Sequence, residues 1–229
     1  MSKYTTLLFD ADETLLNFYE AEANAPKLAC NRMSIDYREE TRCLYSSIND
    51  ALWKQLEKGL VTRDIIKVRR FEQLAKALGL SVNPNEMAES YGEVLSMQGI
   101  ILSGADSLCK KLSDNYRMYI VTNGIGYVQR GRLSRSGLLP YFDGVFISED
   151  IGSQKPDITF FNYIFNEIEE KDKSKICIIG DSMSSDILGG INAGIDTCYF
   201  SPEIKSGPYS PTYTAKSFED IIRIFDFEG

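Results

Sequence analysis

Short apolar runs that end at a polar turn recur along the chain, and they predict five β-strands. In YTTLLFD and KICIIGD the apolar positions are nearly continuous, whereas a strand with one wet face alternates apolar and polar residues. Such runs are typical of strands covered on both faces of a sheet. The predicted strands span residues 4–10, 117–123, 144–148, 175–181 and 196–200.

Helical periodicity fills the segments between the later strands. The predicted helices span residues 128–137, 156–170 and 186–194. Pro156 marks the start of the second, while Gly137 and Gly194 end the other two. Strands that alternate with helices predict a doubly wound α/β fold with a parallel, Rossmann-like sheet. Ligands of such sheets bind beyond the carboxyl ends of the strands, where the strand order reverses.

Residues 17–97 break this alternation. Their apolar positions recur with a helical period, clearest in the stretches 44–61, 62–80 and 83–99, and no convincing strand interrupts them. We therefore expect a core of residues 1–16 and 98–229, with an inserted all-helical cap of residues 17–97 above the strand ends. Near the end of the chain, residues 201–217 predict a loop with one short edge strand, and FEDIIRIF predicts a helix.

Composition narrows the class of protein. The 229 residues are 43% hydrophobic and 25% charged, which is typical of a globular chain with a substantial core. The net charge of −8 and the lack of a Lys/Arg run argue against a nucleic-acid polymer as partner. No apolar run approaches the ~20 residues of a membrane span, so no membrane partner is expected. The sequence carries no signal for an oligomeric state.

Cysteine and histidine usage excludes several kinds of site. The five cysteines are scattered and never form C-x-x-C, so neither a disulfide framework nor a zinc site is predicted, and a reducing cytoplasm is expected. Histidine is absent, which excludes Ser-His-Asp hydrolases, histidine phosphatases and imidazole-bound zinc enzymes. Carboxylates must then carry any acid/base chemistry.

An acidic turn follows the first predicted strand. Asp10, Asp12 and Glu13 stand directly behind apolar residues, and converging carboxylates repel by roughly 1–4 kcal/mol per pair at ~4 Å unless a cation balances them. Two acids at this spacing suit covalent phosphoryl transfer, in which one attacks phosphorus and the other moves protons. The alternative is an Asx-type turn that only caps the following segment.

Further polar residues follow three other predicted strands. Asp181 ends one strand, and Asp186 falls in the first turn of the next helix, an oxygen-only pair that suits Mg²⁺. The alternative is Ser184 or Ser185 as a plain helix cap beside an acid. Thr122 and Asn123 offer a hydroxyl and backbone N–H groups for phosphoryl oxygens, and Lys155 offers a cation, although each is common in purely structural roles. The order of these groups matches what a phosphotransferase site needs.

The motifs DADET, VTNG, QKPD and GDSMSSD together resemble the phosphatases of the haloacid dehalogenase superfamily, and the helical insertion resembles their cap. The resemblance implies Asp10 as nucleophile, Asp12 as general acid/base, and Thr122 and Lys155 as phosphate binders. It also implies Mg²⁺ as cofactor. The implied metal site consists of Asp10, Asp181, Asp186 and the backbone carbonyl of Asp12.

Asp12 and its neighbours narrow the choice of activity within that superfamily. Dehalogenases lack the second aspartate, and phosphonatases have alanine there, so Asp12 implies phosphate ester hydrolysis or transfer. Many sugar-phosphate phosphatases have glycine where Glu13 stands. The wider motifs resemble pyrimidine 5′-nucleotidases of the YjjG/YfnB type, which implies a nucleoside monophosphate as the small phosphorylated substrate. The alternatives are a sugar-phosphate or phosphoglycolate phosphatase, and a catalytically silent module that binds a phosphorylated ligand.

Candidate substrate contacts lie in the predicted cap. Asn17 and Phe18 stand where the chain leaves the acidic turn, so their position favours contact with substrate. Aromatic and basic residues further along are weaker candidates, because tryptophan often packs between helices and arginines often cover a wet face. These are Trp53, Arg63, Arg69 and Arg70.

Overall fold

A parallel sheet of six strands forms the centre of the part of the chain that the structure describes. The structure is a computed structural model that describes residues 3–33, 35–204 and 207–225. The strand order is β3-β2-β1-β4-β5-β6, and every neighbouring pair is parallel. The five expected strands are confirmed, and β6 is the short edge strand expected near the end. The strands are β1 (Thr6–Phe9), β2 (Arg117–Thr122), β3 (Gly144–Ile147), β4 (Ile176–Gly180), β5 (Asp196–Phe200) and β6 (Tyr213–Ala215).

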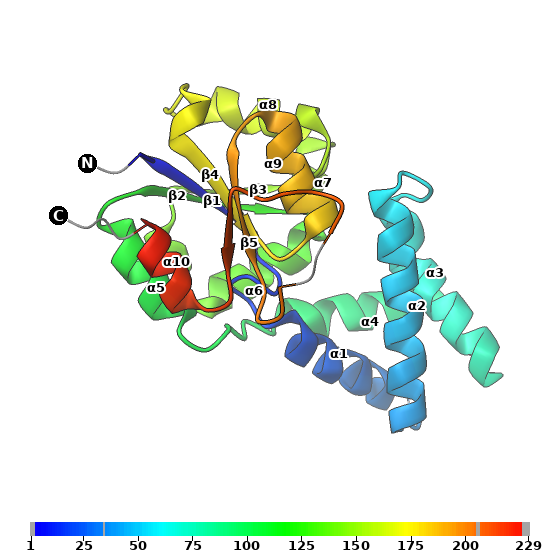
Figure 1. Ribbon diagram of the computed structural model, residues 1–229. Helices are drawn as coiled ribbons and strands as arrows, with labels where there is room; N and C mark the ends of the chain where they lie inside the picture. The colour runs from blue at the N-terminus through cyan, green and yellow to red at the C-terminus, as the bar shows by residue number, and fades with distance from the viewer. Residues whose placement is uncertain (1–2, 34, 205–206, 226–229) are drawn as a thin grey trace.

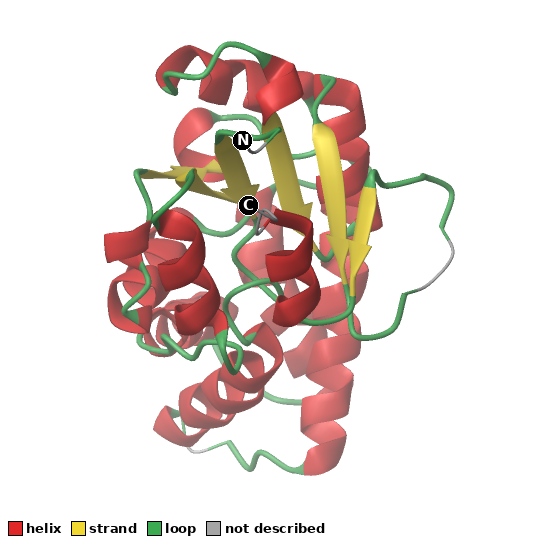
Figure 2. Cartoon of the chain, turned by 60° about the vertical axis from the view of Figure 1, so that its left-hand side comes forward, coloured by secondary structure: helices red, strands yellow, loops and turns green. Residues whose placement is uncertain are grey.

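Helices cover both faces of this sheet, as Figures 1 and 2 show. α5 (Ala105–Ser113) and α10 (Phe218–Phe225) pack on one face. α8 (Ile158–Glu167) and α9 (Leu188–Ala193) pack on the other. Side chains of β1 alternate between the two apolar layers, with Leu7 and Phe9 in the first and Leu8 in the second. The doubly wound α/β prediction is confirmed, and the two dry faces explain the nearly continuous apolar runs.

The strand order places a crevice beside the first strand. The chain builds β2 and β3 on one side of β1, then crosses to build β4, β5 and β6 on the other side. The order therefore reverses between β1 and β4. Parallel sheets of this kind bind ligands at such a reversal, beyond the carboxyl ends of the strands.

Helix boundaries in this region follow local capping chemistry. α6 (Gly126–Ser136) ends at Gly137 with φ 76°, and α9 ends at Gly194 with φ 71°, so both predicted stops are confirmed. α8 begins at Ile158 rather than at Pro156, because the Asp157 side chain accepts a hydrogen bond from the backbone N–H of Thr159. The sequence analysis missed α5, whose nine residues span little more than two turns. The short helices are α7 (Ser148–Ile151), η1 (Leu139–Tyr141), η2 (Lys173–Lys175) and the π-helical turn η3 (Met183–Ile187).

Four helices occupy the segment that was expected to be a cap. α1 (Phe18–Arg32), α2 (Glu39–Glu57), α3 (Arg63–Leu78) and α4 (Pro84–Ser96) group together to one side of the sheet (Figure 1). They enclose a separate apolar cluster in which the rings of Tyr45, Phe71 and Tyr91 lie 5.4–5.7 Å apart between centroids. No helix among the described residues is long and apolar enough to cross a membrane. The division at residues 17 and 97 stays a prediction.

The two connections between the sheet region and the cap helices run side by side. Leu16 and Ile101 form an antiparallel bridge, flanked by hydrogen bonds from Asn17 N to Ile100 O (3.0 Å) and from Leu102 N to Leu15 O (2.9 Å). α4 also packs against α6. These paired connections form a narrow hinge directly behind the acidic turn.

Candidate active site

A buried lysine joins three polar groups at the carboxyl ends of the strands. Lys155 is 1% exposed, and its Nζ donates to Asp10 Oδ1 (2.6 Å), Asp186 Oδ1 (2.7 Å) and the Val121 carbonyl (2.7 Å). An ammonium group has three N–H donors, so these bonds satisfy all of them. Burial alone would lower the pKa of Lys155, but the carboxylates of Asp10 and Asp186 raise it above its usual value. Lys155 is therefore a fixed cation.

Asn123 holds the backbone of that lysine. Its side-chain Oδ1 accepts from the backbone N–H of Lys155 (2.9 Å), and its Nδ2 donates to the Lys155 carbonyl (2.9 Å). The sequence analysis assigned Asn123 to phosphate binding. The structure places this residue beside the cavity with its amide on Lys155, so its geometry supports the cation directly.

Three carboxylates converge around the lysine. Asp10, Asp181 and Asp186 each offer an oxygen, and these oxygens lie within 4.8 Å of one another. The Oδ2 atom of Asp186 also accepts from the backbone N–H of Ser182 (3.0 Å). A Cβ on Gly180 would overlap the Asp186 side chain, so the last residue of β4 has to be glycine. The N-cap of the helical turn η3 is Ser182, rather than the serines 184 or 185 considered as caps.

The cluster holds more acidic than basic side chains. Burial raises the pKa of Asp10 to about 7; Asp186 and Asp12 add to this shift, and Lys155 opposes it. Burial and the neighbouring Asp10 and Asp186 carboxylates likewise raise the pKa of Asp181 well above its usual value. Three carboxylates face a single ammonium group. An oxygen-only set with this excess charge fits Mg²⁺, which prefers carboxylate ligands.

Asp12 turns toward α6 instead of the lysine. Its Oδ2 accepts from Gln129 Nε2 (2.9 Å), and its Oδ1 forms an ion pair with Arg132 Nη1. Gln129 Nε2 also lies 2.8 Å from the Thr122 hydroxyl oxygen, so one amide links Asp12 to Thr122. The sequence analysis missed Gln129 and Arg132. The available signal was weak: two polar residues three apart on one face of a polar helix.

The acidic turn adopts a backbone conformation that favours glycine. Glu13 has φ 54°, in the left-handed region, which fits the glycine that many sugar-phosphate phosphatases of the superfamily have there. The Glu13 carboxylate accepts a hydrogen bond from the backbone N–H of Tyr19 at the start of α1 (2.9 Å). Burial raises the pKa of Glu13, and its bonds to the backbone of Tyr19 and Phe18 oppose that shift. The turn is thereby tied to the first cap helix.

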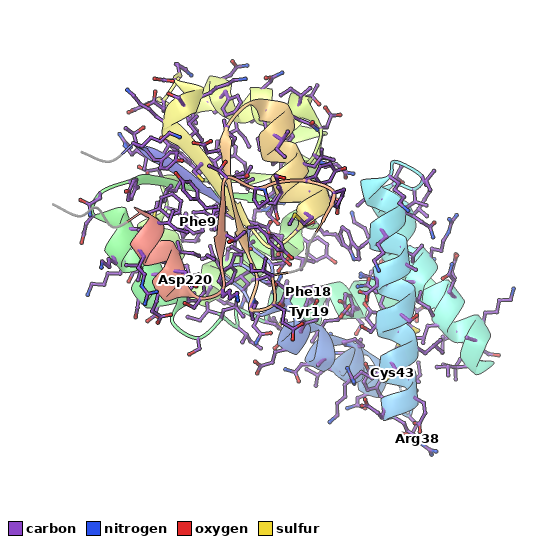
Figure 3. All side chains as sticks on the ribbon, in the orientation of Figure 1. Phe9, Phe18, Tyr19, Arg38, Cys43 and Asp220 are labelled. Carbon is purple, nitrogen blue, oxygen red and sulfur yellow. The ribbon has the colours of Figure 1, made fainter. Side chains whose placement is uncertain are left out.

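A cavity of about 550 Å³ lies between the strand ends and the cap helices. Figure 3 places Phe18 and Tyr19 at the start of α1, between the two regions. From the sheet side the cavity is lined by Asp10, Asp12, Thr122, Asn123, Gln129, Arg132, Lys155 and Asp181. From the cap it is lined by Phe18, Tyr19, Asn49, Trp53, Arg70 and Tyr91.

Only some of the cap residues named from the sequence border the cavity. Phe18, Trp53 and Arg70 border the cavity. Arg69 is exposed, and the side chain of Arg63 lies outside the described part of the structure. Asn17 caps α1, because its Oδ1 accepts from the backbone N–H of Glu20 (2.9 Å), and it is absent from the cavity lining.

A buried polar network in the cap reaches the same cavity. Asn49 Nδ2 donates to Glu22 Oε1 (2.6 Å), and Arg70 Nη1 lies 3.2 Å from Asn49 Oδ1. The guanidinium of Arg70 also lies 4.3 Å from the ring centroid of Tyr91. Burial raises the pKa of Glu22 to about 7, an effect that the charge of Arg70 opposes. Glu22 and Asn49 were not found from the sequence.

Known proteins are similar to this chain over nearly its whole length. The model of the haloacid dehalogenase-like hydrolase family matches residues 7–200. YfnB of Bacillus subtilis, named as a HAD-hydrolase, is 38% identical to this chain over 100% of this chain and 98% of its own. The crystal structure of YfnB bound to magnesium superposes on this structure with a TM-score of 0.93, over 98% of this chain and 99% of that one. The pyrimidine 5′-nucleotidase PynA of Streptococcus pneumoniae is 38% identical over 97% of this chain and 95% of its own. The pyrimidine 5′-nucleotidase YjjG of Escherichia coli is 34% identical over 96% of both chains. This chain therefore belongs to the haloacid dehalogenase-like hydrolase family.

Proposed function

We propose that the chain is a Mg²⁺-dependent phosphatase that hydrolyses phosphate monoesters through an aspartyl-phosphate on Asp10. One observation carries the proposal. A buried carboxylate at the end of β1 has one oxygen fixed by a buried lysine, and a second acid stands two residues further along. This arrangement suits nucleophilic attack followed by proton transfer.

The reaction divides into two steps. An oxygen of Asp10 attacks phosphorus, the bond from phosphorus to the ester oxygen breaks, and Asp12 gives its proton to the leaving alcohol. Water then attacks the phosphorus of the aspartyl-phosphate, Asp12 takes the proton of that water, and inorganic phosphate leaves with the Asp10 carboxylate restored. Asp12 therefore acts as acid first and as base second.

Phosphate and metal binding fall to the residues around Asp10. Lys155 supplies a fixed positive charge for the phosphoryl group. The Thr122 hydroxyl oxygen accepts from Gln129 and from the backbone N–H of Gly124, which leaves its O–H to donate to a phosphoryl oxygen. Mg²⁺, held by the three converging carboxylates and the Asp12 carbonyl, would balance their charge and that of the phosphoryl group. The magnesium in the YfnB crystal structure supports this metal.

We assign pyrimidine nucleoside monophosphates as substrates. PynA and YjjG are named as pyrimidine 5′-nucleotidases, and aromatic side chains of Phe18, Tyr19 and Trp53 line the cap side of the cavity, where a flat base can stack. The interdomain movement reported for YfnB supports a cap that moves against the core during turnover. Five free cysteines suit a reducing cytoplasm.

Phosphate release from a substrate panel tests the proposal. The panel holds pyrimidine and purine nucleoside monophosphates, sugar phosphates and phosphoglycolate, each with Mg²⁺ or with EDTA. We expect metal-dependent release that favours UMP, dUMP or dTMP. Preference for a sugar phosphate would agree with the proposed mechanism but contradict the proposed substrate. Ligand binding by calorimetry without release from any member would favour the silent binding module.

A further inference from the structure

Arg132 joins parts of the molecule that are far apart in sequence. Its side chain is 1% exposed and forms the ion pair with Asp12. Its Nε lies 3.3 Å from the Gln98 carbonyl oxygen, and its guanidinium lies 5.4 Å from the ring centroid of Phe18. One buried arginine thus contacts the acid/base candidate and two residues of the cap connections.

Those two residues flank the hinge. Phe18 begins α1 immediately after Asn17, which is hydrogen-bonded to Ile100 of the returning connection. Gln98 lies between the end of α4 and that same paired stretch. A shift of the cap at the hinge therefore displaces both contacts of the guanidinium. Because the guanidinium contacts both the Phe18 ring and the Gln98 carbonyl, such a shift changes the surroundings of Arg132.

Neither side-chain oxygen of Asp12 is free to face a leaving group in the arrangement described. Gln129 donates to one of these oxygens and Arg132 to the other. A general acid has to present an oxygen to the leaving group, and here both oxygens are bound to side chains of α6 instead. The carboxylate must be repositioned before it acts, and Arg132 is its contact with the part of the molecule that moves.

We propose that Arg132 is a positioning residue that couples the place of the helical cap to the place of the Asp12 carboxylate. The inference rests on the proposed function, because the place of Asp12 matters only if this residue transfers the proton. Cap closure over a substrate then sets Asp12 for the leaving group, and an open cap keeps the acid withdrawn.

Leaving-group dependence separates this role from a merely structural one. An alkoxide such as the ribose 5′-oxygen needs a proton as it departs, whereas p-nitrophenolate is stable as an anion. kcat/KM reports only the steps up to that departure. In Arg132→Met we expect kcat/KM for UMP to fall at least about tenfold and kcat/KM for p-nitrophenyl phosphate to stay within about twofold of wild type.

Two further variants control the experiment. Arg130→Met removes another arginine of α6 that pairs with an aspartate, Asp150, at an exposed position, so both substrates should be cleaved as in wild type. Arg132→Lys keeps the charge beside Asp12 but cannot span Phe18 and the Gln98 carbonyl at once. It should show the same selective loss as Arg132→Met, to a smaller extent. Wild-type rates in Arg132→Lys, or equal losses on both substrates in Arg132→Met, overturn the coupling.

A distance measurement tests the coupling without turnover. Cys43 is exposed on α2 of the cap, as Figure 3 shows, while the other four cysteines are buried, and Asn162 is exposed on α8. Spin labels on Cys43 and on Asn162→Cys report the cap position by electron double resonance. Arg132→Met should broaden or shift the distance distribution, and Arg130→Met should leave it unchanged. An unchanged distribution in Arg132→Met overturns the inference even if wild-type protein releases no phosphate, an outcome that would overturn the proposed function separately.

Discussion

Two groups of buried charges meet at the same cavity, and they are balanced differently. At the strand ends, Asp10, Asp181 and Asp186 surround the single ammonium of Lys155. In the cap, Glu22 is balanced by Arg70 through the amide of Asn49. The first group has three acidic side chains and one ammonium group, which fits the proposed cation site. The second pairs one acidic side chain with one guanidinium.

Under the proposed function, this difference separates the reactive site from a network that only supports the fold. Buried charges cost free energy unless they are paired and hydrogen-bonded, so a balanced network is what a stable fold retains. An unbalanced network persists only where function requires it. Substitutions at the strand ends should therefore abolish turnover without lowering the free energy of unfolding. Substitutions in the cap network should mainly lower the free energy of unfolding.

The largest expected effect is on turnover. Asp10→Asn removes the attacking oxygen and keeps the shape, so phosphate release should fall at least about a thousandfold. The free energy of unfolding without Mg²⁺ should not fall, because one carboxylate leaves a crowded group. Phosphate release and urea denaturation measure the two effects. Asp150→Asn, at a half-exposed position on α7, is the matched control, and more than 1% residual activity in Asp10→Asn would contradict the assignment.

In the cap, the opposite pattern is expected. Arg70→Met leaves Glu22 buried without its balancing charge and should lower the free energy of unfolding by about 3 kcal/mol. The double variant Glu22→Gln/Arg70→Met should lose less than Arg70→Met alone. Arg69→Met, at the exposed neighbouring position, should lie within about 0.5 kcal/mol of wild type in the same urea titration. Equal losses of stability in Arg69→Met and Arg70→Met would show that the buried pairing of Arg70 with Glu22 does not stabilise the cap.

The buried glutamate also predicts a pH dependence of stability. Its pKa rises from 4.5 to about 7 on folding, so the folded chain keeps this proton after the unfolded chain has lost it. The contribution is complete below about pH 4.5 and is lost as the pH rises through about 7. The free energy of unfolding of wild type minus that of Glu22→Gln should fall by up to about 3 kcal/mol over this range. If this difference stays constant with pH, Glu22 is not the group that makes stability depend on pH.

Metal binding should give the smallest of these effects. Mg²⁺ at about 100 times its Kd should raise the free energy of unfolding by about 2.7 kcal/mol, and EDTA should reverse the gain. The gain should grow as the pH rises through about 7, because Asp10 must lose its proton to bind a cation. Thermal unfolding with and without Mg²⁺ measures it. Asp181→Asn should lose the gain and Glu22→Gln should keep it; the same gain in Asp181→Asn would exclude this cluster as the metal site.

Much of the sheet and of the strand-end site could be predicted from the sequence, because both depend on parallel strands that are buried on both faces. Parallel strands buried on both faces leave nearly unbroken apolar runs, and the first polar residue after each run stands at the same edge of the sheet. Asp10 and Asp181 were found in this way, and β1 and β4 place them side by side. Asp186 and Lys155 join them at that edge.

The rest depends on contacts that no local pattern encodes. Arg132 and Gln129 meet Asp12 across more than a hundred residues, and in sequence they look like any polar face of a helix. Arg69 and Arg70 are neighbours with the same local pattern, yet one is exposed and the other is buried. Packing of the cap helices decides between them, and that packing is a property of the tertiary structure.

The central position of β1 has a consequence for folding. Leu8 of this strand pairs with Tyr119 on one side and with Ile178 on the other, so β1 completes its pairing only with partners more than a hundred residues further along the chain. The cap also depends on a pairing of distant segments, because α1 packs against α4. A folding chain therefore leaves one edge of β1 unpaired until β4 docks beside it. Asp10 meets Asp181 and Asp186 only at that step, so the carboxylate cluster forms when the two halves of the sheet join.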